Sequence, residues 1–515
     1  MPLDPEICWR ACTSRDRRFD GRFFTAVSTT HIYCRPGCPA KMPARRNVQF
    51  YSSAAAAESA GFRPCRRCRP ETSPGSAAWI GAPALVGRAM RLIEAGALGA
   101  HGDRDGERGV EALAARLGIG GRRLRQLFAE HVGASPLEVA RTHRAHLARR
   151  LLETTAAPLE DIAQAAGYAS ARRLHAALKT SFRATPGELR SGRRTSAPRT
   201  RALALRLPAR APFDAAPLLR FLGARGITGL EHVTDGVYHR AFRLGDDVGR
   251  LEALPDATGV TLSITSASAR ALVPVAARIS RMFDLEADTV AIAAHLRRDP
   301  ALRSRVPVEG VRVPCAWDPF EHAVRALLGQ QVTVAGACTL AARLVARCGE
   351  ALPTTLADER ITHLFPTPER VAVANLDGLG ITGARIRAIH GLARAVAEGA
   401  LDLTAHASLE SAVEALVALP GIGDWTAQYI ALRGLGEPDA FPAGDLGVRK
   451  SLAHDGVLAS EKDAVARAEA WRPWRGYAVI SLWTHGTPEP DPKSKPRPKP
   501  KPQHAGAQPA RRTTR

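Results

Sequence analysis

The stretch Leu419–Gly434, LPGIGDWTAQYIALRG, joins a tight turn to the start of a helix. Gly421 and Gly423 flank one isoleucine, and glycine permits the backbone angles that a sharp turn needs. A helix-forming run follows at once and carries Trp425 and Tyr429. Successive backbone N–H groups at such a turn point outward at a helix N-terminus, which suits a phosphate. A lone Gly-x-Gly turn is a weak indication, and its meaning depends on the residues around it.

An aspartate follows this turn about two dozen residues downstream, where DAFPAGDLGVRKSL places Asp445 at the expected start of another helix. The combination of hairpin and aspartate resembles the helix-hairpin-helix base-excision glycosylases. Three more stretches resemble the AlkA-type 3-methyladenine glycosylases: RVPCAWDPFEHAVRALLGQQVTVAGACTLAARL, AWRPWRGYAVISLW and APFDAAPLLRFLGARGITGLEHVTDGVYHRAF. The resemblance covers roughly residues 201–487.

This resemblance implies excision of alkylated bases by hydrolysis of the N-glycosidic bond. Alkylation of a purine ring nitrogen makes the base cationic and a good leaving group, and its loss leaves an oxocarbenium-like sugar. A nearby carboxylate stabilises that cation, so Asp445 is the expected catalytic residue. Whether it also orients the attacking water stays open. The damaged base must leave the duplex, at a cost of roughly a few kcal/mol.

Aromatic residues are expected to receive the flipped base, because a cationic base gains about 0.5–2 kcal/mol from each good cation–π contact. Trp425 and Tyr429 are four residues apart and share one helix face, while the resemblance adds Trp483 and Phe221. Core packing is an alternative role for any one of them, but the four together favour a pocket. In LLGQQVT, Gln331 stands where some relatives insert an apolar wedge, and we expect it to fill the emptied base stack.

Trp425 separates two kinds of glycosylase. Lyase members of the superfamily carry a Schiff-base lysine at the matching position, and an indole cannot form that bond. The sequence therefore predicts a monofunctional enzyme that leaves an abasic site. Two alternatives stay open: a bifunctional glycosylase/lyase, and a transcription regulator whose glycosylase-like half only binds DNA.

The chain has 515 residues, too many for one hydrophobic core, so we expect several domains. The predicted fold class is multidomain and mostly α. Composition, periodicity and motif spacing predict a small α+β domain that binds zinc, an all-α double helix-turn-helix domain, a small α+β domain, an all-α domain and a disordered Pro/Lys/Arg tail. The glycosylase resemblance implies that the second all-α domain is a helix-hairpin-helix domain. The expected ranges of these segments are 1–75, 80–192, 201–310, 313–487 and 488–515. The tail is either a solubilising segment or a non-specific DNA tether.

Two cysteine pairs stand in the first segment. HIYCRPGCPAK contains Cys34 and Cys38, and GFRPCRRCRP contains Cys65 and Cys68. Two close pairs separated by a small folded segment are typical of a tetrahedral zinc site with four thiolate ligands. A short domain with few large apolar residues would need such a staple. Spacing alone favours a structural zinc ion.

The residues around these cysteines resemble the N-terminal domain of the Ada methylation-response family over nearly its whole length. In that family one zinc-bound cysteine takes a methyl group from a DNA methylphosphotriester, and the matching residue here is Cys34. A zinc-bound thiolate stays deprotonated and nucleophilic. Its methylation removes one negative charge and is expected to raise the affinity for DNA. Thr30 and Arg63 match family positions that contact the site or the DNA backbone, whereas Lys41 replaces an expected arginine.

Two segments of the second domain share one plan: GVEALAARLGIGGRRLRQLFAEHVGASP and PLEDIAQAAGYASARRLHAALKTSFRATPGELR. Each has a short apolar helix, a turn with glycine and an Arg-rich second helix, which predicts two helix-turn-helix units. Arginines begin the second helices, where DNA contacts are expected: Arg122, Arg123, Arg172 and Arg173. The second segment resembles the arabinose-regulator family of DNA-binding domains. A packing domain of five or six helices is the alternative.

The formal net charge of +22 favours a polyanionic partner, because neutralising phosphates releases counterions. We expect double-stranded DNA, at damaged sites and promoters, with RNA polymerase as a further candidate partner. The N-terminus lacks the apolar core of a signal peptide, and no stretch is apolar enough to cross a bilayer. We therefore expect a cytoplasmic monomer with no membrane partner and reduced cysteines.

Overall fold

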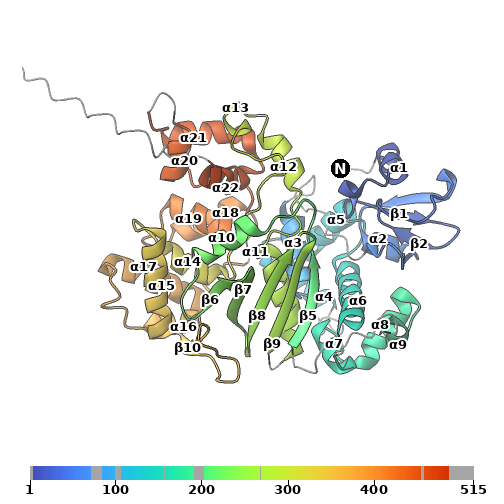
Figure 1. The fold of residues 1–515 in the computed structure, drawn as a ribbon, viewed down its shortest axis with the longest axis horizontal. Helices are drawn as coiled ribbons and strands as arrows, with labels where there is room; N and C mark the ends of the chain where they lie inside the picture. Colours follow the sequence, from blue (N-terminus) through green and yellow to red (C-terminus); the bar gives the residue numbers. More distant parts are fainter. Residues whose placement is uncertain are drawn as a thin grey trace, which may run out of the picture.

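The computed structural model describes residues 4–70, 84–98, 106–155, 157–190, 202–266, 268–404, 406–453 and 457–485. Within these ranges the chain forms a small sheet, a group of helices, a five-stranded sheet and a larger group of helices, in that order (Figure 1). The predicted fold class, multidomain and mostly α with two small α+β parts, is confirmed. The expected disordered tail at 488–515 lies outside the described residues.

The first part contains a four-stranded sheet in the order β3–β1–β2–β4. Its elements are α1 (Pro5–Thr13), β1 (Phe24–Val27), β2 (Ile32–Cys34), β3 (Val48–Tyr51), α2 (Ala54–Ser59) and β4 (Arg63–Pro64). β2 and β4 run parallel, so the end of β2 and the residues after β4 meet at one end of the sheet. One apolar cluster of this part has only five buried members: Phe24, Ala26, Tyr33, Ala57 and Phe62. A core this small makes a metal staple physically reasonable.

The helices of the second part are α3 (Ala84–Glu94), α4 (Gly106–Arg116), α5 (Gly121–His131), α6 (Pro136–Thr154), α7 (Leu159–Ala165), α8 (Ala171–Phe182) and α9 (Pro186–Arg190). Gly118 lies between α4 and α5, and Gly167 between α7 and α8. Their φ angles are +69° and +76°, which glycine adopts without strain. Both helix pairs therefore have the short glycine turn that the sequence predicts.

The third part is an antiparallel sheet in the order β5–β9–β8–β7–β6. Its elements are β5 (Ala202–Pro208), α10 (Ala216–Gly223), β6 (Glu231–Thr234), β7 (Val237–Leu244), β8 (Asp247–Asp256), β9 (Gly259–Ser266) and α11 (Leu272–Met282). Alternate residues of β8 and β9 are buried, so one face of the sheet carries the core. Helix α11 packs on β5 and β9.

The last part is helical. It contains α12 (Thr289–Leu296), α13 (Pro300–Arg303), α14 (Pro319–Leu328), α15 (Val334–Cys348), the short strands β10 (Glu350–Ala351) and β11 (His363–Leu364), α16 (Pro368–Val373), α17 (Gly383–Ala397), α18 (Leu409–Val417), α19 (Asp424–Ile430), a π-helical turn (Ala431–Leu435), α20 (Leu446–Ser451), α21 (Glu461–Ala468) and α22 (Arg475–His485). Across the described ranges, no helix combines the length and apolarity that a membrane crossing needs.

The apolar core continues across the junction between the second and third parts. Leu174 and Leu178 of α8 are fully buried in the same cluster as Leu205 of β5 and Phe242 of β7. Helix α6 also packs against β5. Burial of each large apolar side chain contributes about 1.5–3 kcal/mol. The second helix-turn-helix unit and the five-stranded sheet therefore stabilise each other.

A buried ion pair joins α3 to the last part of the chain. Arg88 donates from Nε and Nη2 to the two carboxylate oxygens of Glu437, at 2.9 and 2.8 Å, and from Nη1 to the carbonyl oxygen of Ala407. His406 Nε2 lies 3.1 Å from the same carboxylate. Burial alone would raise the pKa of Glu437, but hydrogen bonds from His406 and Arg88 and the nearby positive charges outweigh it and lower the pKa to about 2. The carboxylate is therefore ionised at neutral pH.

Arg88→Met should remove two charge-assisted hydrogen bonds from this buried carboxylate, which then keeps only His406 and Arg91, 3.6 Å away, and should lower the free energy of unfolding at pH 7 by about 1.5–3 kcal/mol. The folded pKa of Glu437, about 2, lies below the unfolded value, so the stabilisation is present above about pH 4.3 and is lost as pH falls toward 2. Urea denaturation should show that wild type and variant differ less in their free energy of unfolding in acid than at pH 7. Arg116→Met is the control, since Arg116 bonds only to exposed Thr404 across this interface. Equal losses in both variants would contradict the assignment.

Candidate functional site

The hairpin predicted from the sequence joins α18 to α19. Gly421 has a φ of +88°, and a Cβ on it would lie 2.6 Å from the Cβ of Ala388 in α17. Only glycine fits this backbone and this space. Gly423 differs: it is the N-cap of α19 with a φ of −87°, and a Cβ there would meet nothing within 4 Å. Ile422 is buried between them, so the turn is anchored in the core while both glycines stay exposed.

The loop between α14 and α15 lies against this hairpin. Gln330 donates from Nε2 to the carbonyl oxygen of Gly421 at 3.0 Å and to Oγ1 of Thr426 at 3.1 Å. Its own carbonyl oxygen accepts from Nη2 of Arg385 at 2.6 Å. The next residue, Gln331, is exposed and has a φ of +57°. The structure therefore places the predicted wedge residue at a sharp, exposed turn beside the hairpin.

Asp445 is the N-cap of α20, and three N–H groups donate to its carboxylate. Oδ1 accepts from the backbone nitrogen of Val448 and from Nε1 of Trp483, both at 2.9 Å. Oδ2 accepts from Nε1 of Trp425 at 3.2 Å. Gly447 keeps the approach to the carboxylate free of a side chain, because a Cβ there would lie 3.0 Å from Oδ1. The carboxylate is thus held in one orientation and remains half-exposed.

Tyr429 contacts both tryptophans. Its ring stacks on Trp425 with centroids 5.5 Å apart and planes 11° apart, and it meets Trp483 edge-on at 6.0 Å. His322 of α14 packs against the same ring at 4.9 Å. Burial lowers the pKa of His322 well below its usual value, so its imidazole is neutral. The structure brings three predicted aromatics together as one surface that ends at the Asp445 carboxylate.

Two arginines missing from the predicted site adjoin this surface. Arg433 donates from Nη1 to Oη of Tyr429 at 2.9 Å, and its guanidinium carbon lies 4.6 Å from the ring centroid of Phe221. The guanidinium carbon of Arg225 lies 3.6 Å from the same centroid. Burial would raise the pKa of Tyr429, but the charge of Arg433, its hydrogen bond to the hydroxyl and the charges of Arg225 and Arg325 together outweigh burial and lower the pKa. Phe221 therefore contacts two guanidinium groups, and its role in receiving a base stays a prediction.

Helical spacing was the signal that could have revealed these arginines. Arg433 follows Tyr429 by four residues, and Arg225 follows Phe221 by four. Side chains at i and i+4 meet on one face of a helix. His322 had no comparable signal, because only the tertiary packing of α14 against α19 brings it to Tyr429.

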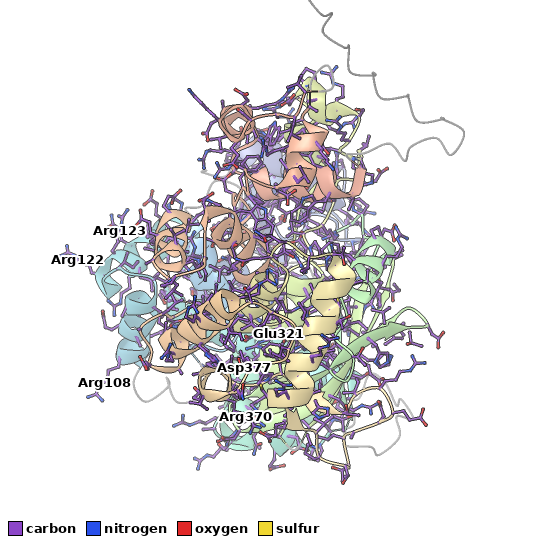
Figure 2. All side chains as sticks on the ribbon, turned by 90° about the vertical axis from the view of Figure 1, so that its left-hand side faces the viewer. Arg108, Arg122, Arg123, Glu321, Arg370 and Asp377 are labelled. Carbon is purple, nitrogen blue, oxygen red and sulfur yellow. The ribbon has the colours of Figure 1, made fainter. Side chains whose placement is uncertain are left out.

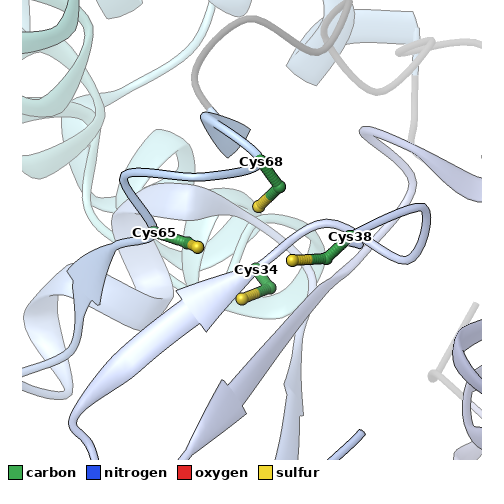
Figure 3. A group of neighbouring side chains, drawn as sticks. All are labelled: Cys34, Cys38, Cys65 and Cys68. Carbon is green, nitrogen blue, oxygen red and sulfur yellow. The ribbon is translucent and has the colours of Figure 1, made fainter. Parts of the chain in front are cut away.

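The four predicted zinc ligands converge at the end of β2 (Figure 3). The Sγ atoms of Cys34, Cys38, Cys65 and Cys68 all lie within 4.8 Å of one another. A set of four sulfur donors this close together fits a tetrahedral zinc ion with Zn–S distances of about 2.3 Å. Cys65 and Cys68 are buried, whereas Cys34 and Cys38 are partly exposed.

A carboxylate fixes the loop between Cys34 and Cys38. Oδ1 of Asp20 accepts from the backbone nitrogen of Gly37 at 2.8 Å, and Oδ2 lies 3.3 Å from Nη1 of Arg35. The carbonyl oxygen of Asp20 accepts from Nη1 of Arg210, which follows β5, at 3.2 Å. The cysteine loop is therefore tied to the part of the chain that carries the five-stranded sheet.

The other predicted contacts of this domain flank β2. Thr30 lies in the exposed turn before β2, at the end opposite Cys34. Arg63 is half-buried on β4 and pairs with Ile32 of β2. Cys8 belongs to a separate apolar cluster, and burial raises the pKa of its thiol to about 12. Cys8 is therefore a protonated core thiol.

The predicted DNA-contacting arginines of the helix-turn-helix units are exposed: Arg122 and Arg123 at the start of α5, and Arg172 and Arg173 at the start of α8. Figure 2 shows Arg122 and Arg123 projecting outward from α5 at the edge of the molecule. Leu174 and Leu178 on the same helix, α8, face the core. The second helices thus present a basic face and bury an apolar one.

Four families match consecutive stretches of the chain. They are "Metal binding domain of Ada" over residues 7–71, "Helix-turn-helix domain" over 113–192, "AlkA N-terminal domain" over 204–318 and "HhH-GPD superfamily base excision DNA repair protein" over 324–476. Their order is the one that the resemblances in the sequence predict.

The chain is similar along almost its whole length to the "Probable bifunctional transcriptional activator/DNA repair enzyme AlkA" of Mycobacterium tuberculosis. The two are 43% identical over 491 residues, which is 94% of this chain and 97% of that protein. "DNA-3-methyladenine glycosylase 2" of Escherichia coli is 37% identical over 53% of this chain and 94% of its own length. "Bifunctional transcriptional activator/DNA repair enzyme Ada" of Escherichia coli is 36% identical over 29% of this chain and 38% of its own length.

Gly421→Ala should disrupt the hairpin. The new Cβ meets Ala388 and the backbone favours glycine, so we expect a loss of about 2–4 kcal/mol in stability and weaker binding of duplex DNA. Gly423→Ala is the matched control, because its conformation and surroundings accept a methyl group at a cost below about 1 kcal/mol. Thermal unfolding and fluorescence anisotropy with a labelled duplex would measure both effects. Similar behaviour of the two variants would refute the role given to Gly421.

Proposed function

The chain belongs to the family of bifunctional transcriptional activator/DNA repair enzymes, and from that membership we propose the chemistry of its two halves. The C-terminal half is a DNA glycosylase that excises alkylated bases of the 3-methyladenine type from double-stranded DNA. The N-terminal half senses methylphosphotriesters and binds promoter DNA. The observation that carries the first assignment is the Asp445 carboxylate held between the indole N–H groups of Trp425 and Trp483.

Excision depends on the charge that develops on the sugar. As the bond from C1′ to the base nitrogen breaks, its electron pair leaves with the base and the sugar becomes oxocarbenium-like. The carboxylate of Asp445, fixed by three N–H donors, is preorganised to stabilise that cation without reorienting. Water then adds to C1′ and loses a proton, which leaves an abasic site.

The hairpin and the neighbouring loop position the duplex for this step. The exposed turn at Gly421 and Gly423 contacts the DNA backbone beside the extruded nucleotide. Gln331, on the exposed turn next to it, fills the gap in the base stack. The aromatic surface of Trp425, Tyr429 and Trp483 receives the base. Trp425 takes the place of a Schiff-base lysine, so the enzyme is monofunctional.

Cys34 is the proposed methyl acceptor of the sensor half. Its thiolate attacks the methyl carbon of a methylphosphotriester: a carbon–sulfur bond forms, the carbon–oxygen bond breaks, and an ordinary phosphodiester leaves. Zinc bound by the four cysteines would keep the attacking sulfur deprotonated. Partial exposure favours Cys34 over buried Cys65 and Cys68. Cys38 is also partly exposed, and the family resemblance decides between these two.

Methylation converts one thiolate to a neutral thioether and lowers the negative charge of the cysteine cluster. Repulsion from the DNA phosphates falls, so affinity for DNA rises. The two helix-turn-helix units then hold a promoter through the exposed arginines of α5 and α8. We propose that the chain acts there as a monomer and contacts RNA polymerase.

Asp445→Asn should slow base release by about 10²–10³-fold or more, because the fixed negative charge is lost while an oxygen remains to cap α20. Single-turnover release of methylated bases from randomly methylated DNA would measure the effect, and affinity for duplex DNA should stay within about threefold. Asp424→Asn, at an exposed carboxylate in the first turn of α19, is the control.

Two results would contradict this catalytic assignment. Release by Asp445→Asn at the wild-type rate would show that another group does the chemistry. A wild-type chain that binds the duplex but releases no base would support the alternative of a regulator that only binds DNA. Borohydride should trap no covalent adduct, and a trapped adduct would instead indicate a lyase.

Exposure of the zinc-loaded protein to methylphosphotriester DNA should add one methyl group, found by peptide mass spectrometry on Cys34. Cys34→Ser should take up none, and Cys348→Ser, whose thiol lies outside the cluster, should be methylated like wild type. Affinity for promoter DNA should rise after methylation and fall more steeply with salt, because the protein then presents more net positive charge to the phosphates. Methylation at Cys38, or no methylation, would remove the basis of the switch.

A further inference from the structure

The two arginines beside the aromatic surface lack acidic partners. Arg433 is only 6% exposed, and its guanidinium donates to neutral oxygens: Nε to the carbonyl of Pro314 and Nη1 to Oη of Tyr429, both at 2.9 Å. Within the part of the chain that the structure describes, no carboxylate oxygen lies within 4.0 Å of Arg433 or of half-buried Arg225. Both positive charges are therefore uncompensated.

Two other buried arginines in this protein have carboxylate partners, whereas buried Arg312, like Arg433, bonds to backbone carbonyl oxygens. Arg88 bonds to Glu437 through two nitrogens, and Arg240 bonds to Glu231 and Glu321. Leaving a buried charge without an opposite charge is costly, so it persists only where something maintains it. Its position against the predicted base pocket suggests that the pocket is the reason.

The guanidinium groups of Arg433 and Arg225 lie against aromatic rings of the proposed base pocket. The guanidinium carbon of Arg433 is 5.8 Å from the ring centroid of Tyr429 and 4.6 Å from that of Phe221. Arg225 is 3.6 Å from the Phe221 centroid. Burial lowers the pKa of Arg225, and the charge of Arg433 lowers it further, so the two cations act on each other.

A fixed positive charge affects cationic and neutral bases in opposite ways. A cationic base, such as 7-methylguanine, is repelled when it enters the pocket, and the repulsion weakens binding. A neutral purine, such as hypoxanthine, meets no repulsion on entry. When its bond to C1′ breaks, the electron pair leaves the base with negative charge, which a nearby guanidinium stabilises until water supplies a proton.

We propose that Arg433, supported by Arg225, is a specificity-determining residue that shifts excision from cationic alkylated bases toward neutral damaged purines. This inference rests on the proposed glycosylase function. In this proposal the positive charge of the two arginines raises KM for cationic bases, because it opposes their binding. The same charge raises kcat for neutral bases, because it stabilises the departing base. Tyr429 transmits part of the effect, because its hydroxyl accepts a bond from the cation and its ring becomes a poorer partner for a positive base.

The test compares matched duplexes that contain one 7-methylguanine or one hypoxanthine. Kinetics of Arg433→Met should show a lower KM for 7-methylguanine and a lower kcat for hypoxanthine. Because each effect comes from one unit charge close to the base, the ratio of the two kcat/KM values should change by about tenfold or more. Arg433→Lys, which keeps the charge, should restore most of the wild-type ratio.

Two further variants keep the result interpretable. Arg225→Met removes the half-exposed charge and should shift the ratio in the same direction by a smaller factor, even if Arg433→Met folds poorly. Arg278→Met is the control: Arg278 also covers an aromatic ring, that of Trp317 at 5.0 Å, but it is paired with Asp318. Its ratio should equal that of wild type.

The outcomes separate this inference from the proposed function. If wild type releases neither base, the proposed function fails. If wild type releases base but Arg433→Met and Arg225→Met slow both substrates by the same factor, the arginines only support the fold and the inference is overturned. A changed ratio in Arg278→Met would overturn it as well.

Discussion

The bonds between Arg88 and Glu437 hold the two halves of the chain in one arrangement. They join α3, in the regulatory half, to the residues that directly follow the π-helical turn at Ala431–Leu435. That turn carries Arg433, which bonds to Tyr429 of the aromatic surface. A helix of the N-terminal half therefore contacts the chain only a few residues from the proposed base pocket, so both halves support the proposed excision site.

Within the excision half, the geometry of the site depends on one carboxylate. The oxygens of Asp445 accept bonds from Trp425, at the start of α19, and from Trp483, near the end of α22. Three helices far apart in sequence thus meet at two oxygen atoms. The same indoles pack against Tyr429, so in the proposed function the group that would stabilise the sugar cation also fixes the aromatic surface that would receive the base.

Motifs whose chemistry is local could be predicted from the sequence. The hairpin glycines, Asp445 at a helix start and the two cysteine pairs are set by spacing, and the structure brings the four sulfurs together. The pairing of Arg88 with Glu437 could not be predicted, because the partners are 349 residues apart and no pattern links them. Arg225 and Arg433 had a helical spacing that pointed to them, but their lack of acidic partners is a property of the tertiary structure. Composition likewise divides the chain at residues 191–201, whereas buried side chains on both sides belong to one core.

The shared core has a consequence for the life of the protein in the cell. In the proposed function, Cys34 accepts a methyl group once, whereas Asp445 can act on one lesion after another. Because α6 and α8 pack with the five-stranded sheet, removal of the sensor half would expose apolar side chains of that sheet to water. In the proposed function, a chain that has accepted a methyl group therefore still carries its glycosylase half, and the record of damage lasts as long as that molecule does.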